Sequence, residues 1–407
     1  MAEGIGGVET QATGPRRMGW VILLCLCVAA LEGYDIQAFG VAAPALAAAL
    51  RLEPGQMGWA GGAAMMGLVA GALLGGWIAD RVGRKPVLVA SVAAFGLFSL
   101  GTALARGYEP LLLARFATGL GFGGAMPNLI AVATEISPPG KRAATVTTMF
   151  CGMPAGGAAV ALLARYLGAD LNWREVFLIG GALPILLTPL VLLLLPETRP
   201  APAAGADRHL VRALFGDGRA AGTLLLWTAF VLTLMVTYLM LNWLPTLVIA
   251  KGLTPTMGSE AALSFNLTSI AGSLLLGMAI DRAGFRWPLA GAFLALAAAM
   301  LALAAATGAR PVLILSGLAG FMVLGAQFAL YAVAPTLYPP QVRAAGTGAA
   351  VGVGRLGSIA GPLIAGQLRE AGFSAGQVFG AMTPVVLAAG AAALALSYLS
   401  RPMEPDG

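Results

Sequence analysis

The sequence predicts an all-α membrane protein with twelve transmembrane helices, arranged as two halves of six. The first observation is composition: of the 407 residues, 58% are hydrophobic and only 10% are charged, and the mean hydropathy is +0.85. A soluble domain carries about 25% charged residues, so a water-soluble fold of this length could not cover so much apolar surface. The other two observations are a regular series of long apolar stretches and an internal repeat.

Twelve apolar stretches are long enough to cross a bilayer, which takes about 20 residues of helix. Polar, glycine or proline residues separate them and mark the membrane surfaces. Among the prolines inside the stretches, Pro127 and Pro154 predict kinks in the fourth and fifth helices. In chain order, the predicted helices cover residues 19–45, 56–79, 86–105, 110–134, 143–167, 174–195, 221–249, 260–280, 288–307, 311–336, 344–368 and 376–399.

Two separate motifs recur later in the chain at the same offset of 201 residues. The segment Gly76–Arg84 returns as Gly277–Phe285, and Pro138–Ala144 returns as Pro339–Ala345. A shared offset predicts two parallel halves related by an axis along the membrane normal, with the binding site between them near the midplane. The longest polar interruption separates the halves. We therefore predict an N-terminal half at 1–195, a cytoplasmic linker at 196–220 and a C-terminal half at 221–407.

The distribution of positive charge predicts the orientation in the membrane. Fifteen lysines and arginines fall on the side that holds both termini and the linker, and seven fall on the other side. Because cytoplasmic loops carry the excess of these residues, both termini are predicted to be cytoplasmic. The net charge of +6 therefore reflects topology and not affinity for nucleic acid. We expect a multi-pass monomer in a bacterial inner membrane.

Two carboxylates interrupt the first predicted helix. Glu32 and Asp35 are three residues apart, so they share one helix face. An acid at bilayer depth costs at least about 2.5–3.5 kcal/mol and persists mainly where it serves a protein-lined pathway. We expect Asp35, with Glu32 beside it, to bind a transported proton. The alternative is a structural ion pair with Arg115 or Arg355.

Two arginines also lie inside predicted helices. Arg115, in the fourth helix, either binds a substrate carboxylate with its guanidinium or anchors the helix at the membrane surface. Arg355 lies deeper, between Gly352, Gly354 and Gly357, which allow close helix packing. A buried cation requires an anion, either a protein acid or the transported molecule, and we favour the transported molecule.

Polar and aromatic residues on the seventh and tenth helices form candidate walls for a substrate. Tyr238 and Asn242 share one face, as do Gln327 and Tyr331. Aromatic walls with few hydrogen-bonding groups suit a planar organic acid. Asn128 and Asn266 are further polar residues at membrane depth, for which the sequence suggests no role.

The loop between the second and third helices resembles the signature of the major facilitator superfamily. It consists of Gly76, three further residues, then Asp80-Arg81-Val82-Gly83-Arg84-Lys85, and its weaker copy contains Asp281 and Arg282. This resemblance covers nearly the whole chain. It implies the major facilitator fold and a gating role for Gly76, Asp80, Arg81, Gly83, Arg84, Asp281 and Arg282.

Two further segments are similar to the aromatic acid:proton symporters of that superfamily. Glu32-Gly33-Tyr34-Asp35 resembles an acid-Gly-aromatic-Asp pattern in their first helix, although glutamate replaces the usual aspartate. Arg115–Gly123, followed by Pro127 and Glu135, is similar to their fourth helix. The resemblance implies import of an aromatic carboxylate of the benzoate, hydroxybenzoate or phenylpropionate type, coupled to protons, by alternating access.

Several alternatives share this architecture. They are a proton-coupled sugar or polyol carrier, another organic-acid carrier, a drug or metabolite exporter, and a membrane-embedded sensor without net transport. The segment Leu195–Arg199 resembles the one after the sixth helix of sugar carriers. The sequence contains no cofactor fingerprint and no metal-ligand spacing, and its one histidine is His209. We therefore expect no enzyme activity, no cofactor and no metal.

Overall fold

A computed structural model of the chain describes residues 15–137, 142–167, 172–197, 214–216, 218–338 and 343–399. Within these ranges it contains twelve helices long and apolar enough to cross a membrane, which confirms the predicted number. The repeated motif at 138–144 and 339–345, most of the linker and His209 lie partly or wholly outside the described residues. The division into halves at 195 and 221 therefore remains a prediction.

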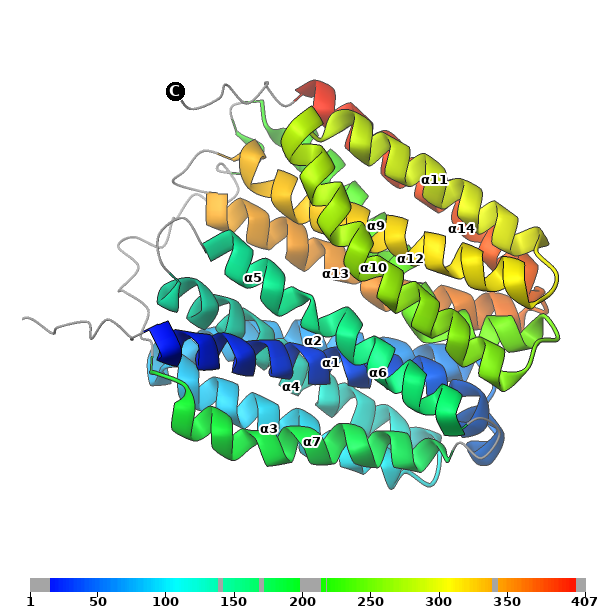
Figure 1. Cartoon of the computed structure of the whole chain (residues 1–407), viewed down its shortest axis with the longest axis horizontal. Helices are drawn as coiled ribbons and strands as arrows, with labels where there is room; N and C mark the ends of the chain where they lie inside the picture. The colour runs from blue at the N-terminus through cyan, green and yellow to red at the C-terminus, as the bar shows by residue number, and fades with distance from the viewer. Residues whose placement is uncertain are drawn as a thin grey trace, which may run out of the picture.

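The first half of the chain forms six spans from seven helices, which Figure 1 shows grouped on one side of the molecule. The fifth span consists of two helices, α5 and α6. The bounds are α1 (Pro15–Leu50), α2 (Pro54–Val82), α3 (Arg84–Ala103), α4 (Tyr108–Ile136), α5 (Arg142–Phe150), α6 (Gly152–Leu167) and α7 (Trp173–Leu194).

The second half lies on the other side of the molecule in Figure 1 and also forms six spans. A short 3-10 helix, η2, extends the tenth span. The bounds are α9 (Ala220–Ala250), α10 (Pro255–Ala283), α11 (Arg286–Ala305), α12 (Ala309–Val333), η2 (Ala334–Leu337), α13 (Arg343–Glu370) and α14 (Ala375–Leu399).

Several helices extend past the predicted spans because capping groups lie outside the apolar stretch. α10 begins at Pro255, before the predicted 260, since the Thr254 side chain accepts a hydrogen bond from the backbone N–H of Met257. Proline suits the first position of a helix, where its missing N–H would have no partner. Hydrophobicity marks the membrane core and does not report these polar first turns.

The predicted irregularity at Pro154 is present as a break between α5 and α6 at Cys151. Proline lacks the N–H that would bond to the carbonyl four residues earlier, which belongs to Phe150. The chain therefore turns between Phe150 and Gly152 at membrane depth. Pro127, by contrast, lies inside α4, which continues unbroken to Ile136.

The internal repeat extends over whole helices. α2 and α10 begin and end 201 residues apart, and α4 matches the combined span of α12 and η2 at the same offset. The contacts between halves are repeated as well: α2 packs on α13, and α6 packs on α10. Because the repeat relates α2 to α10 and α6 to α13, these two contacts are equivalent.

The halves are joined at the ends of the helices that the charge bias assigns to the outer surface. Arg165 Nε, at the end of α6, lies 2.8 Å from Glu260 Oε1, near the start of α10. Gly58 of α2 packs against the backbone of α13, since an added Cβ would lie 2.8 Å from the Pro362 carbonyl oxygen. The structure therefore corresponds to a conformation that is closed on this side.

Candidate functional site

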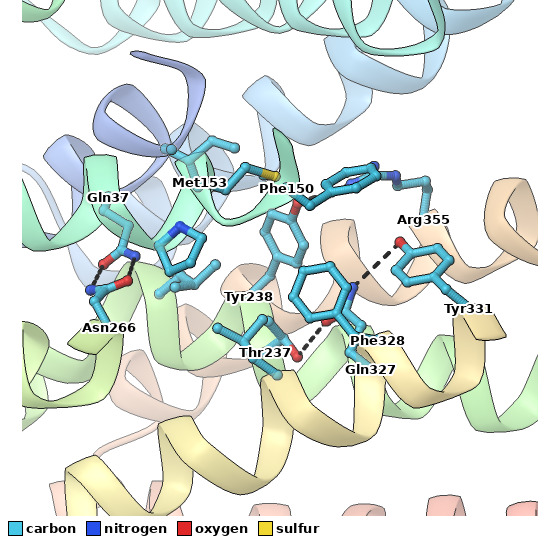
Figure 2. A pocket seen from close by; sticks show the side chains of 15 residues that line it. Gln37, Phe150, Met153, Thr237, Tyr238, Asn266, Gln327, Phe328, Tyr331 and Arg355 are labelled. Atoms are coloured by element: carbon cyan, nitrogen blue, oxygen red, sulfur yellow. Dashed lines mark hydrogen bonds between the residues drawn. The ribbon is translucent and has the colours of Figure 1, made fainter. Parts of the chain in front are cut away.

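A cavity lies between the halves, and both halves contribute to its wall (Figure 2). The first half supplies residues of α1, α5 and α6, and the second half supplies residues of α9, α10, α12 and α13. A cavity shared between the repeats is where alternating access requires the substrate to bind. The residues that line it are Gly33, Ile36, Gln37, Phe150, Met153, Pro154, Thr237, Tyr238, Leu241, Asn266, Leu324, Gln327, Phe328, Tyr331 and Arg355.

Arg355 supplies the positive charge among these lining residues. Its Nη1 donates to the Tyr238 hydroxyl at 2.9 Å, and no acid within 4 Å pairs with it in the described part of the chain. Gly354 and Gly357 bring α13 against α9, because a Cβ at either position would meet Phe230 or Val231. The guanidinium thus lies half-buried at a cavity wall, with donors available for an anion.

Aromatic rings from both halves line one wall of the cavity. Phe150 of α5 lies with its ring centroid 5.9 Å from Phe328 and 6.5 Å from Tyr331, both of α12. The rings of Phe150 and Tyr331 are 15° from parallel. Such walls favour a flat, apolar ligand, since offset stacking and edge contacts add to the burial of its surface.

A row of hydrogen-bonding groups follows α9 and α12. The Thr237 hydroxyl donates to Gln327 Oε1 at 3.0 Å, and Gln327 Nε2 lies 3.5 Å from the Tyr331 hydroxyl. The structure therefore brings together three residues named from the sequence, Tyr238, Gln327 and Tyr331, beside Arg355. Thr237 was not named, because a threonine in an apolar helix usually bonds to its own backbone, as Thr237 also does to Thr233.

A pair of amides forms another part of the wall. Gln37 of α1 and Asn266 of α10 exchange hydrogen bonds in both directions, and Asn266 Nδ2 donates to Gln37 Oε1 at 2.8 Å. Gln37 was not singled out from the sequence, and Asn266 had no assigned role. Neither spacing nor composition relates two residues that are 229 positions apart.

The two acids of α1 have different surroundings. Asp35 is fully buried, with its Oδ2 2.8 Å from Arg115 Nη1 and its Oδ1 2.5 Å from the Ser99 hydroxyl, which donates to it. Glu32 is 1% exposed, and neither carboxylate oxygen has a hydrogen-bond partner among the described residues. Glu32 is nevertheless close enough to Arg355 and Asp35 for their charges to act on it.

Arg115 and Asn242 do not line the central cavity. Arg115 is 1% exposed, and besides its ion pair with Asp35 it lies against the rings of Phe39 and Phe177. Its burial leaves it neither at the membrane surface nor open to a substrate. Asn242 lines a second cavity and donates to the Tyr238 carbonyl on its own helix.

The loop predicted to act as a gate lies at the opposite end of the molecule from the Arg165–Glu260 pair. Gly83 has φ = 101°, a conformation that glycine adopts readily, and it turns the chain from α2 into α3. Arg84 forms an ion pair with Glu135 of α4, and its backbone N–H donates to Glu197 Oε1 at 3.1 Å. Glu197, which follows α7, therefore caps α3.

The remaining gate residues differ between the two copies of the loop. Arg81 lies 3.5 Å over the Trp77 ring, while Asp80 is exposed and Gly76 has open space around it. In the second copy Asp281 and Arg282 are exposed, and Phe285 replaces the arginine. Arg286 instead lies 3.7 Å over the Tyr398 ring. The first copy thus carries the ionic network.

Phe150, Phe328 and Met153 are cavity residues that the sequence did not single out. In a membrane protein an apolar side chain facing lipid and one facing an internal cavity have the same composition, so hydrophobicity carries no signal for them. The break before Pro154 was a usable signal, because irregular backbone at membrane depth is tolerated where it lines a cavity.

Comparisons with known proteins agree with this geometry. The model of the Major Facilitator Superfamily matches residues 25–362. The 3-(3-hydroxy-phenyl)propionate transporter of Escherichia coli (strain K12) is 40% identical over 98% of both chains. The 4-hydroxybenzoate transporter PcaK of Pseudomonas aeruginosa is 34% identical over 92% of this chain and 91% of its own, and the gallate transporter of Pseudomonas putida is 34% identical over 93% and 91%.

Solved structures show the same fold at low identity. A structure of the D-xylose-proton symporter matches with a TM-score of 0.76 at 19% identity, covering 91% of this chain and 96% of that one. A bacterial homologue of the human lysosomal transporter Spinster, in an inward-facing and unoccupied conformation, matches with a TM-score of 0.74 over 95% and 98%. The chain therefore belongs to the major facilitator superfamily and is a membrane transporter, not an enzyme.

Proposed function

We propose that this protein imports an aromatic carboxylate together with protons, by alternating access. The observation that carries the proposal is Arg355, which faces a cavity with aromatic walls and has no acid in hydrogen-bonding contact among the described residues. The curated relatives named for hydroxyphenylpropionate, hydroxybenzoate and gallate support the same substrate class. A sugar would need more hydrogen-bonding partners and fewer phenylalanines around its ring.

The substrate carboxylate would bind to Arg355 in a bidentate manner. A guanidinium presents two parallel N–H groups that match the two oxygens of a carboxylate. The Tyr238 hydroxyl, which already accepts from Arg355, orients the guanidinium and can donate its own proton to the same anion. The ring of the substrate would then lie against Phe150, Phe328 and Tyr331.

Glu32 is the group we assign to the transported proton in this conformation. A buried carboxyl that has no described hydrogen-bond partner is far less costly when neutral than when ionised. It can therefore bind a proton while buried and release it when a conformational change exposes it to water. Asp35 has the opposite environment, because it forms an ion pair with Arg115 and accepts a hydrogen bond from Ser99. Of the two acids expected to carry protons, Asp35 would thus take part only in a conformation that separates it from Arg115.

The charge carried per cycle follows from the number of protons. One proton with a monovalent anion moves no net charge, so uptake would respond to the pH gradient alone. Two protons would move one positive charge, which gains about 2.3 kcal/mol per 100 mV of membrane potential. We propose that the protein lies in a bacterial inner membrane with both termini in the cytoplasm, and that it functions as a monomer.

The gate would act at the loop between α2 and α3. In the closed-outside conformation described here, Arg84 is held by Glu135 of the first half and by Glu197, at the start of the predicted linker. Opening to the outside requires the inner ends of the two halves to approach each other. We propose that Gly76, Asp80, Arg81, Gly83 and Arg84, with the weaker second copy at Asp281 and Arg282, stabilise that approach.

Uptake by proteoliposomes tests the proposal. Purified protein should accumulate radiolabelled benzoate-type acids inside vesicles that are alkaline relative to the medium, and an uncoupler should abolish this. Arg355→Gln should lose at least about tenfold in uptake efficiency, since it removes a charge-assisted pair. Arg355→Lys keeps the positive charge but not the two parallel N–H groups of the guanidinium, and its uptake efficiency should fall less.

Glu32→Gln separates proton coupling from substrate binding. This variant should exchange preloaded acid at a rate near that of the wild type but should not accumulate acid on a pH gradient. Accumulation of glucose, or export of the acid that a proton gradient drives and an uncoupler abolishes, would instead indicate a sugar carrier or an exporter. Accumulation by Glu32→Gln equal to that of the wild type would contradict the role of Glu32.

A further inference from the structure

We propose that the Gln37–Asn266 amide pair is a second recognition point, which hydrogen-bonds a polar ring substituent such as a phenolic hydroxyl. This inference rests on the proposed function, because it concerns the part of an aromatic acid distant from its carboxylate. Figure 2 shows the pair on one side of the cavity and Arg355 on the other, with the aromatic and polar residues between them.

The pair, which lies in the cavity wall, retains unused hydrogen-bonding capacity. Asn266 Nδ2 uses both of its protons, on Gln37 Oε1 at 2.8 Å and on the Ala262 carbonyl at 2.7 Å. Gln37 Nε2 donates one proton to Asn266 Oδ1. One N–H of Gln37 and one lone pair on each amide oxygen have no partner in the described part of the chain. A hydroxyl, which both donates and accepts, matches this set.

The surrounding backbone fixes the pair in place. Gln37 is 4% exposed and Asn266 is fully buried, so neither side chain is free to move into solvent. On α6, Gly157 lies directly against the pair, and a Cβ there would collide with Gln37 Nε2 and lie 2.6 Å from Asn266 Oδ1. A methyl group added at this position would therefore press on both amides.

An amide pair at a cavity wall discriminates between substrates. A ring that carries a hydroxyl at the right position satisfies the unused donor and acceptor, while an unsubstituted ring covers them without replacing their bonds. One such hydrogen bond is worth about tenfold in affinity. The pair also joins α1 to α10, so a bound hydroxyl would contact both halves.

The test compares matched acids in the wild type and in variants. The acids are 3-(3-hydroxyphenyl)propionate against 3-phenylpropionate, and 4-hydroxybenzoate against benzoate. The main variant is the double substitution Gln37→Met with Asn266→Leu, which removes both amides at similar volume and leaves neither one unpaired. Glu260→Gln is the matched control, since it breaks a polar link between the halves that lies away from the cavity.

The wild type should prefer at least one hydroxylated acid about tenfold in kcat/KM, and the double variant should bring this ratio near one. The ratio between the two acids is the readout, because both amides line the proposed site and their removal alters the wall that either acid contacts. Glu260→Gln should change both acids by the same factor. An equal loss of both acids in the double variant would overturn the inference and make the pair a structural link only, as would a wild type without any preference.

A second variant covers the case in which the double variant does not fold. Gly157→Ala keeps both amides but crowds them, and it should lower the preference for the hydroxylated acid while sparing the unsubstituted one. An unchanged ratio in Gly157→Ala would overturn the inference. A wild type that takes up neither acid would overturn the proposed function itself, which the wild-type assay shows before any variant is made.

Discussion

Glu32 and Asp35 lie three residues apart on α1, yet the fold treats them differently. Asp35 has an ion pair with Arg115 and a hydrogen bond from Ser99, whereas Glu32 has neither in the described part of the chain. The sequence places both acids on one face and cannot separate them. Their difference comes from α3 and α4, which bring Ser99 and Arg115 to one acid only.

This difference predicts opposite effects on stability. Asp35→Asn leaves Arg115 as an uncompensated buried cation and should destabilise the protein by about 3–5 kcal/mol. Glu32→Gln removes no described partner and should keep the thermal midpoint in detergent near that of the wild type. Removing the charge of both partners, in Asp35→Asn with Arg115→Gln, should restore part of the loss. Equal midpoints for the two single variants would contradict this reading of the structure.

At the scale of helices, glycines determine how closely α2 and α4 pack. A Cβ at Gly71 would collide with the Leu120 carbonyl oxygen, and one at Gly119 would collide with that of Ala64. The second half repeats both contacts 201 residues later, between Gly272 and Phe321 and between Gly320 and Phe265. Small residues at helix contacts let backbones approach, which drives helix association where lipid removes the hydrophobic effect.

The glycine contacts predict a sharp contrast along α2. Gly71→Ala should lower the thermal midpoint by several degrees or reduce the yield of folded protein, because backbone has to move to admit a single methyl group. Gly76→Ala, five residues further on, meets no atom within 4 Å and should keep the midpoint of the wild type. The measurement is size-exclusion chromatography after heating. A Gly71→Ala protein as stable as Gly76→Ala would contradict the packing described here.

The two copies of the gate loop also differ at this scale. Glu197 caps the first turn of α3 and Arg84 pairs with Glu135, whereas the second copy has no described ion pair. Glu197→Ala should slow uptake several-fold with little effect on the midpoint, since an exposed ionic contact is worth about 0–1 kcal/mol. Asp281→Asn, in the second copy, is the comparison and should have the smaller effect. The reverse order would show that the second copy carries the gate.

For the whole molecule, the halves are held together at the ends predicted to face outside. Arg165 of α6 and Glu260 of α10 form an ion pair there, and Gly58 packs on α13 near the same end. Alternating access requires these contacts to separate in each cycle. The repeat makes the α6–α10 contact equivalent to the α2–α13 contact. One rigid movement of the halves can therefore separate both contacts on this side while the other side closes.

A crosslink across this closed end should stop transport. In a variant without Cys25, Cys27 and Cys151, we would introduce Arg165→Cys and Glu260→Cys and treat it with a short thiol crosslinker. The crosslinked protein should lose uptake and exchange, while each single-cysteine variant keeps both after the same treatment. Binding of the acid should survive, since the cavity stays formed. Full exchange after complete crosslinking would show that this contact does not open during the cycle.

The twelve spans and the repeat at an offset of 201 residues can be predicted from the sequence alone. So can the location of four charged residues inside the membrane: Glu32, Asp35, Arg115 and Arg355. Hydrophobicity and charge are sufficient for these predictions, because a polar or charged group inside the bilayer is costly and is therefore rare. Which of these charged groups contact one another depends on the tertiary structure. It joined Asp35 to Arg115, left Glu32 without a described partner, directed Arg355 to the cavity, and placed Gln37 against Asn266. Contacts between helices depend on the packing of residues far apart in the chain, and no periodicity of a single helix records them.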